Sequence, residues 1–357
     1  MKVGILTHHN VSSHGALLQM YGLKSELEAM GHSVCILTYN RNLDFIDEKT
    51  QKRFSASIKN LPYYLSSYMG NDGPFALLYQ FRKQKILAKF RNKNFEFIPY
   101  VDSNKLDAVV VGADEVFALE NGVNMMMFGH GITSRKIISY APSFGQTDIS
   151  RINRFGMREL MQSGLNKFDD LSVRDENSKS ILRELINKEV PVVCDPALLH
   201  PFSPQKRTRP KKYIAVYSYQ SNFKDKKRIR MIQKYASKNG CELWSVGAYY
   251  KWCHKKVNCD PLQMLDVFSG AEAVITDTFH GTISSVIAKT PVAVFVRENN
   301  SNKLDDLLRI LGLTNRKVLS AEMLESVLEQ NMDFDKISKN VDALRTEGLN
   351  YLRNALN

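Results

Sequence analysis

The chain has 357 residues, 43% of them hydrophobic, and a net charge of +12 from 49 basic and 37 acidic residues. This length predicts about two domains of roughly 150 residues, and the composition excludes a disordered, collagen-like or coiled-coil chain. No apolar run approaches the roughly 18 residues of a membrane-spanning helix, and the apolar start at residues 3–6 is too short for a signal peptide. Five cysteines without dense spacing predict reduced thiols in a cytoplasmic protein.

The first half of the chain alternates short apolar runs with stretches of helical spacing. Residues 2–7 predict a strand, an apolar helical stripe follows within residues 16–30, and residues 34–39 predict the next strand. Further strands are predicted at residues 107–111, 137–140, 171–174 and 190–194, and a helix at residues 176–186. This order predicts a largely parallel sheet covered by helices on both faces.

A second set of alternating elements follows a break in composition. Three prolines and clustered charge at residues 200–210 predict an irregular linker, where we place the domain boundary. Beyond it, strands are predicted at residues 213–217, 242–246, 273–276 and 291–296, and helices at residues 224–237 and 333–356. We therefore predict an α/β protein with two doubly wound, Rossmann-like domains, residues 1–200 and 201–330. A C-terminal helix in residues 331–357 is expected to pack back toward the first domain.

Positive charge is concentrated in one segment. Between Lys206 and Arg230, ten basic residues stand against one acid, Asp225. Such a segment can attract an anionic membrane surface or an anionic substrate, and it can equally be a solvated linker and helix face. No nucleic-acid partner is predicted, because no zinc-finger, homeodomain or RNA-recognition signature accompanies the charge.

Several familiar chemistries lack their signatures in this chain. The sequence contains no G-x-G-x-x-G, no G-x-x-x-x-G-K-[ST], no H-E-x-x-H and no G-x-S-x-G. Cys253, His254 and Cys259 lack the paired short spacing that structural zinc sites favour. No metal site is therefore predicted.

Residues 273–288 hold the most informative pattern. A buried strand runs into a polar turn with His280 and Gly281, and a helix begins there. Helix N-termini expose unpaired N–H groups and a positive dipole end, and a glycine lets the backbone approach an anion closely. The turn therefore suits a phosphate or carboxylate. The alternative is a purely structural loop in which Asp277 or Thr278 caps the helix.

This segment, Thr276-Asp-Thr-Phe-His-Gly-Thr282, resembles the TDSFHGT-type signature of the polysaccharide pyruvyl transferase family. Other segments resemble motifs of that family in the same order: Gly15-Ala-Leu-Leu-Gln19 with Tyr21, Val110-Val-Gly-Ala-Asp-Glu-Val-Phe117, Ile138-Ser-Tyr-Ala-Pro-Ser-Phe-Gly145, Leu171-Ser-Val-Arg-Asp175 and Cys194-Asp-Pro-Ala-Leu198. The resemblance extends over residues 2–316.

The resemblance implies a fold like that of glycosyltransferase-B enzymes, with two Rossmann-like domains facing across a cleft. It also implies transfer of the pyruvyl unit of phosphoenolpyruvate to two hydroxyls of one sugar, forming a cyclic ketal and releasing phosphate. No cofactor is implied beyond phosphoenolpyruvate as co-substrate. The implied acceptor is a sugar or a lipid-linked oligosaccharide for a cell-surface polysaccharide, with peripheral contact to an anionic membrane as an open expectation.

The donor site implied by the resemblance centres on His280, which can act as an acid or bind phosphate because its reference pKa lies near neutrality. Arg174 is carried over beside it, because a guanidinium offers a bidentate fork to a carboxylate or phosphate. The remaining expected donor-binding residues are Thr278, Gly281, Thr282 and Lys303, the last at a position where the family often has arginine. Alternatively, His280 fixes its turn through a hydrogen bond and Arg174 forms a salt bridge.

The acceptor is expected against the first domain, near His8, His14 and Glu115, because these loops follow predicted strands at their carboxyl ends. Asp114 is the candidate base, with a pKa raised by partial desolvation, and its alternative role is to cap the following turn. The chain departs from the family pattern at Ala113, Glu115 and Phe117, where Ser, Gln and Trp are usual. Two other functions stay open: a glycosyltransferase that uses a nucleotide sugar, and a noncatalytic anion-binding relative.

Overall fold

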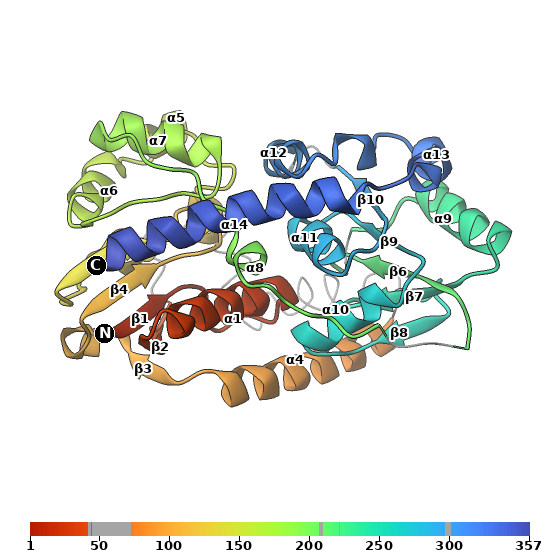
Figure 1. Cartoon of the computed structure of the whole chain (residues 1–357), viewed down its shortest axis with the longest axis horizontal. Helices are drawn as coiled ribbons and strands as arrows, with labels where there is room; N and C mark the ends of the chain where they lie inside the picture. Colours follow the sequence, from red (N-terminus) through yellow and green to blue (C-terminus); the bar gives the residue numbers. More distant parts are fainter. Residues whose placement is uncertain (42–43, 45–72, 207–209, 221, 297–300) are drawn as a thin grey trace.

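The computed structural model describes residues 1–41, 44, 73–206, 210–220, 222–296 and 301–357. Within these residues, two separate parallel sheets form the centres of two α/β halves (Figure 1). No helix in the described ranges is long and apolar enough to cross a membrane. The first half of the predicted basic segment includes residues 207–209, which lie outside the described residues.

The first sheet has the strand order β3-β2-β1-β4-β5, and every neighbouring pair is parallel. Its strands are β1 (Lys2–Leu6), β2 (Ser33–Thr38), β3 (Phe97–Pro99), β4 (Ala108–Val111) and β5 (Lys136–Ser139). The helices of this half are α1 (His14–Ala29), α4 (Pro74–Asn94), α5 (Ile149–Arg154), α6 (Arg158–Leu165), α7 (Glu176–Ile186) and α8 (Pro196–Leu199). Strand order reverses between β1 and β4, which makes that gap the switch point of the sheet.

The second sheet repeats this arrangement with one more strand, in the order β11-β10-β9-β6-β7-β8. Its strands are β6 (Tyr213–Tyr217), β7 (Glu242–Val246), β8 (Lys255–Val257), β9 (Ala273–Thr276), β10 (Val292–Phe295) and β11 (Lys317–Val318). Its helices are α9 (Lys226–Lys238), α10 (Pro261–Ser269), α11 (Phe279–Ile287), α12 (Ser301–Leu311) and α13 (Leu324–Glu329). The switch point here lies between β6 and β9. Both sheets therefore have the doubly wound order of Rossmann-like domains.

The last helix, α14 (Phe334–Leu356), lies across both halves (Figure 1). Its Tyr351 hydroxyl donates to the Ser139 carbonyl at 2.8 Å, and Arg345 Nε donates to the Leu199 carbonyl at 2.9 Å. Asn340, near its other end, donates to the Leu311 carbonyl of α12 at 3.4 Å. The helix thus contacts both the first half and the second.

Two predicted strands, residues 171–174 and 190–194, are wrong. Only isolated bridges form there, from Ile138 to Asp170 and from Val173 to Val192. The Ser139 hydroxyl donates to the Ser172 carbonyl at 2.8 Å, and the Ser172 hydroxyl donates to the Ser139 carbonyl at 2.9 Å. Side-chain bonds therefore replace part of the main-chain ladder next to β5, where the main chain forms only isolated bridges.

Candidate active site

The two switch points bring four loops toward one another. His8 follows β1 and Asp114 follows β4 in the first half, while Ser218 follows β6 and His280 follows β9 in the second. Ligands of doubly wound sheets bind beyond the carboxyl ends of the strands at such points. The His280 ring lies against the start of α1, because a Cβ built on Gly15 would stand 2.2 Å from its Cγ. A glycine at position 15 therefore permits the close contact between the two halves.

The turn around His280 is organised by hydroxyl groups. Thr278 is the N-cap of α11, and its Oγ1 accepts a hydrogen bond from the Gly281 N–H at 3.0 Å. The Thr282 hydroxyl donates to the Thr278 carbonyl at 3.1 Å. A Cβ on Gly281 would stand 2.2 Å from Thr276 Oγ1, so the missing side chain makes room for these hydroxyls.

Three of the residues expected to bind the donor are engaged within the turn itself. The N–H of Gly281 is used by the cap, and the side chains of Thr278 and Thr282 are 4% and 0% exposed and bonded within the turn. The first-turn N–H groups that have no intrahelical partner are those of Phe279 and His280. The capping alternative describes Thr278, while the helix start itself remains available to an anion.

A buried carboxylate, Asp195, is the centre of the site. It is the N-cap of α8, and its side chain accepts hydrogen bonds from the Ala197 N–H at 3.0 Å, from Arg174 Nη1 at 3.1 Å and from the Gln19 amide. His280 Nε2 lies 3.5 Å from Asp195 Oδ2. Burial works to raise the pKa of Asp195, but His280, Arg174 and the N–H of Ala197 outweigh it and lower that pKa to about 2. Asp195 is therefore ionised across the working range of an enzyme.

Arg174 lies between two carboxylates and an aromatic ring. Its Nη1 is 3.1 Å from Asp195 Oδ2 and 3.8 Å from Asp114 Oδ1, and its guanidinium lies 4.6 Å from the centre of the Phe279 ring. Burial works to lower the pKa of Arg174, but Asp195 and Asp114 raise it overall, so the charge is permanent. Both carboxylates contact Nη1, whereas a guanidinium has five N–H donors in its fork. Arg174 thus forms the salt bridge of the alternative interpretation, and the ion pairs found among the described residues involve only its Nη1.

Asp114 stands opposite Arg174, in a left-handed backbone conformation with φ of +77°. Its side chain is 26% exposed. Burial works to raise the pKa of Asp114, but Arg174, His280 and His8 together lower it below the ordinary value. The expected upward shift toward neutrality is therefore wrong, because three cationic or ionisable neighbours surround this carboxyl. Asp114 is ionised and can still accept a hydrogen bond from a hydroxyl.

The two histidines expected near the acceptor differ in their surroundings. His8 is partly buried; its Nδ1 lies 3.3 Å from the Tyr39 hydroxyl, and burial lowers its pKa. His14 is 1% exposed, and its Nε2 lies 2.9 Å from the Cys259 carbonyl of the second half. Burial lowers the pKa of His14 to about 3. His14 thus joins the two halves as a neutral, buried side chain, and its expected role in binding the acceptor stays a prediction.

Glu115 and Lys303 were expected on opposite sides of the site, and the structure brings them together. Lys303 Nζ on α12 lies 2.7 Å from Glu115 Oε1 of the first half. Both side chains are partly exposed, at 30% and 23%. This ion pair joins the two halves. The charge of each side chain is therefore partly neutralised by the other.

The charges, not a cavity, identify this site. Cavities of about 510 Å³ beside α4 and about 470 Å³ beside the linker after His200 have linings that do not include His280. His280 Nε2 is buried without a well-aligned hydrogen-bond partner among the described residues. No group of three or more His, Cys, Asp or Glu within the described part of the chain is arranged to hold a metal ion. The arrangement can bind an anion, donate a proton from a histidine and accept one at a carboxylate.

Sequence reasoning missed Asp195 as a site residue, although it stands in the quoted segment Cys194-Asp-Pro-Ala-Leu198. It also missed Phe279, next to His280, whose ring receives the Arg174 guanidinium. Gln19, which donates to Asp195, lies in the first quoted segment. Each could have been suspected from its motif, but none from spacing or hydrophobic period.

Known proteins resemble this chain in sequence and in fold. A family model described as polysaccharide pyruvyl transferase matches residues 14–299. Among solved structures, a putative UDP-N-acetylglucosamine 2-epimerase from Listeria monocytogenes has a TM-score of 0.55 at 10% identity, covering 98% of this chain and 94% of that one. A spinosyn rhamnosyltransferase complexed with spinosyn aglycone has a TM-score of 0.52 at 11% identity, covering 100% of both chains. A search of curated proteins gave no match. At these identities the structural likeness shows the fold alone, and it confirms the expected glycosyltransferase-B-like class.

Proposed function

This chain belongs to the polysaccharide pyruvyl transferase family, and on that premise we propose that it transfers the pyruvyl unit of phosphoenolpyruvate to a sugar. The acceptor is a sugar of a cell-surface polysaccharide or of its lipid-linked precursor. The product is a cyclic ketal on two hydroxyls of one sugar. The observation that carries the proposal is the convergence of Arg174 and His280 on Asp195 at the switch points of both sheets.

The proposed transfer balances without an oxidant or reductant. One acceptor hydroxyl adds to C2 of the enol, and a proton added to the C3 methylene turns it into a methyl group. The second hydroxyl then displaces phosphate from C2, and its proton leaves with the phosphate. Ketal and inorganic phosphate are the products, so the site needs an acid, a proton acceptor and cations for two anionic groups.

The residues of the site match these needs. The fork of Arg174 binds the carboxylate or phosphate of the donor, beside the N–H groups at the start of α11. His280 Nε2 supplies the proton to C3 or binds the phosphate. Asp114, ionised because of its lowered pKa, accepts the proton of the first hydroxyl. Asp195 touches neither reactant in this scheme and acts as a positioning residue for Arg174 and His280.

The test is phosphate release from phosphoenolpyruvate in the presence of candidate acceptors, with the acceptor's mass followed for the addition of one pyruvyl unit. His280→Ala should abolish release while leaving the protein folded, and His32→Ala, just before β2, is the matched control. Full activity of a folded His280→Ala variant removes His280 from the mechanism.

Ligand-induced stabilisation separates the alternative functions. Phosphoenolpyruvate should raise the melting temperature of the wild-type protein, and Arg174→Lys should reduce that shift. A shift with nucleoside diphosphates alone would favour the glycosyltransferase, and a shift with neither would favour a noncatalytic relative.

A further inference from the structure

The outer face of α4 combines exposed apolar side chains with positive charge. Phe75, Leu78 and Phe81 are 66%, 47% and 54% exposed, three of the nine exposed large hydrophobic side chains in the described residues. The helix has six Lys or Arg and no acidic residue along its 21 positions. Soluble monomers rarely gather such side chains in one place without a function for them.

The opposite face of α4 is fixed to the body of the protein. The Tyr79 hydroxyl donates to the Val257 carbonyl at 2.6 Å, and the Asn258 amide donates to the Tyr79 carbonyl at 3.1 Å. Lys83 Nζ donates to the Gly247 carbonyl at 2.8 Å. Hydrogen bonds therefore fix the inner side of the helix against the second half. The apolar side chains on its outer side cannot turn toward the core without breaking these bonds.

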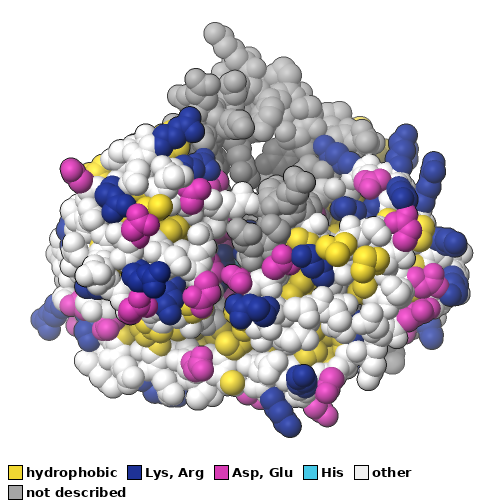
Figure 2. Space-filling model, turned by 90° about the horizontal axis from the view of Figure 1, so that it is seen from above, with side chains coloured by type: hydrophobic (Ala, Val, Ile, Leu, Met, Phe, Trp, Pro, Cys, Tyr) yellow, Lys and Arg dark blue, Asp and Glu magenta, His cyan; other side chains and the backbone are white. Residues whose placement is uncertain are grey.

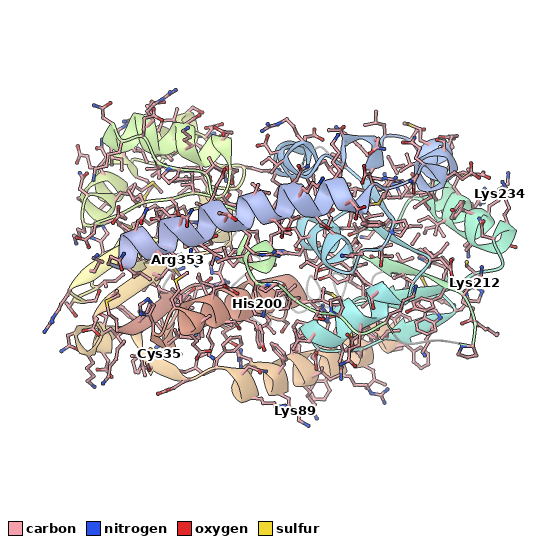
Figure 3. All side chains as sticks on the ribbon, viewed as in Figure 1. Cys35, Lys89, His200, Lys212, Lys234 and Arg353 are labelled. Carbon is pink, nitrogen blue, oxygen red and sulfur yellow. The ribbon has the colours of Figure 1, made fainter. Side chains whose placement is uncertain are left out.

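Between this helix and the second half lies a groove of about 510 Å³. Phe75 and Leu78 form part of its apolar lining, and Arg82, Lys85 and Lys256 line it with positive charge. Lys85 Nζ also lies 4.4 Å from the centre of the Phe81 ring, so charge and aromatic surface are interleaved. No cation of α4 forms an ion pair with any other residue for which the structure gives a position. Figure 3 shows Lys89 on the side of α4 that faces away from the body.

The basic helix α9 lacks this combination. On α9, Lys227 pairs with Glu322 at 2.5 Å and Lys238 pairs with Glu325, so part of its charge is neutralised. None of the exposed large hydrophobic side chains of the described residues lies on α9. On the face seen in Figure 2, basic and acidic side chains are interspersed. Charge alone thus does not single out α4, but charge beside exposed aromatic and aliphatic side chains does.

We propose that the outer face and groove of α4 dock on an anionic phospholipid bilayer. Phe75, Leu78 and Phe81 enter the headgroup boundary, and Arg82 and Lys85 bind lipid phosphates. Interfacial helices of this kind place apolar side chains in the boundary and cations on the headgroups. Each cation near such a surface strengthens binding, so a helix without acids is favoured. The proposal does not rest on the pyruvyl transfer.

The experiment is sedimentation with vesicles of phosphatidylcholine alone and of phosphatidylcholine mixed with phosphatidylglycerol. Wild-type protein should bind the anionic vesicles and not the neutral ones. The double variant Arg82→Gln/Lys85→Gln should bind anionic vesicles at least about tenfold more weakly. Its matched control removes two exposed charges from the other basic helix, Lys226→Gln/Arg230→Gln, and should keep wild-type binding.

Insertion is measured separately with Leu78→Trp, whose exposed indole should shift its emission to the blue on anionic vesicles and be quenched by brominated lipid. All variants change exposed side chains, so their melting temperatures should match the wild type. The proposal is overturned if wild-type protein does not bind anionic vesicles, or if the α9 control loses as much binding as Arg82→Gln/Lys85→Gln. It is also overturned if the emission maximum of Leu78→Trp does not shift.

Discussion

Replacing Asp195 with asparagine tests the centre of the site. Asparagine has the shape of a protonated aspartate, keeps an oxygen for the Ala197 N–H and lacks the charge that faces Arg174 and His280. The pKa of Asp195 is lowered from 3.8 to about 2, and each pKa unit is worth about 1.4 kcal/mol. The variant should therefore lose about 2 kcal/mol of unfolding free energy at neutral pH.

The stability difference between wild type and Asp195→Asn should depend on pH. Because the folded-state pKa of Asp195 is depressed, its stabilisation is fully present above the unfolded-state value of 3.8 and is lost as pH falls through about 2. The difference between wild type and Asp195→Asn should shrink to about half by pH 3, since a protonated Asp195 resembles the variant. Urea unfolding at pH 7, 5 and 3 measures it.

The matched control is Asp225→Asn at the exposed N-cap of α9, where the side chain accepts from the Lys227 N–H at 2.8 Å. Asparagine caps helices about as well as aspartate, so this variant should be near wild type at every pH. Equal unfolding free energies for wild type and Asp195→Asn, or a difference independent of pH, would refute the inference that ionised Asp195 stabilises the site. Donor binding should also weaken in Asp195→Asn, because Arg174 loses its 3.1 Å partner.

Three further changes probe the same site. Arg174→Lys keeps the charge but loses the fork, so the Kd for phosphoenolpyruvate should rise at least about tenfold in calorimetry; an unchanged Kd excludes direct contact. Asp114→Asn should lower turnover about a hundredfold with near-normal melting temperature and donor binding. In the wild type, the lowered pKa of Asp114 should keep this carboxyl ionised down to below pH 3.8. A loss of turnover on acidification near neutral pH would therefore come from another group. Gly281→Ala should lower the free energy of unfolding, measured in urea, by about 2 kcal/mol, because its Cβ would stand 2.2 Å from Thr276 Oγ1. An unchanged free energy of unfolding would mean that the turn can move to accept the methyl group.

The buried strands of the second half were readable from the sequence. The expected bounds 213–217, 242–246 and 273–276 are those of β6, β7 and β9, because each is a short apolar run buried almost throughout. Residues 171–174 and 190–194 have similar composition and form only isolated bridges. Whether an apolar run becomes a strand depends on its pairing with a neighbouring strand edge, and next to Ser139 side-chain hydroxyls make part of that pairing.

The helix start at His280 could also be predicted from neighbouring residues in the sequence. The sequence predicts a helix start here, with Asp277 or Thr278 as the alternative caps, and the structure selects Thr278. The resemblance in sequence added His280 and Arg174 to one site. It left Asp195 out, because a carboxylate beside a proline reads as an ordinary helix cap until its partners are known.

Sequence alone therefore determined the two alternating halves, the capped turn at His280 and the family, since each depends on neighbouring residues or an ordered series of motifs. Only the tertiary structure decided which charges meet. Asp195 gathers Gln19, Arg174 and His280 from three distant segments, and His14 becomes a buried link between the halves. The direction of the Asp114 pKa shift followed from the same assembly: burial and neighbouring cations act in opposite directions, and their balance depends on distances that exist only in the folded chain.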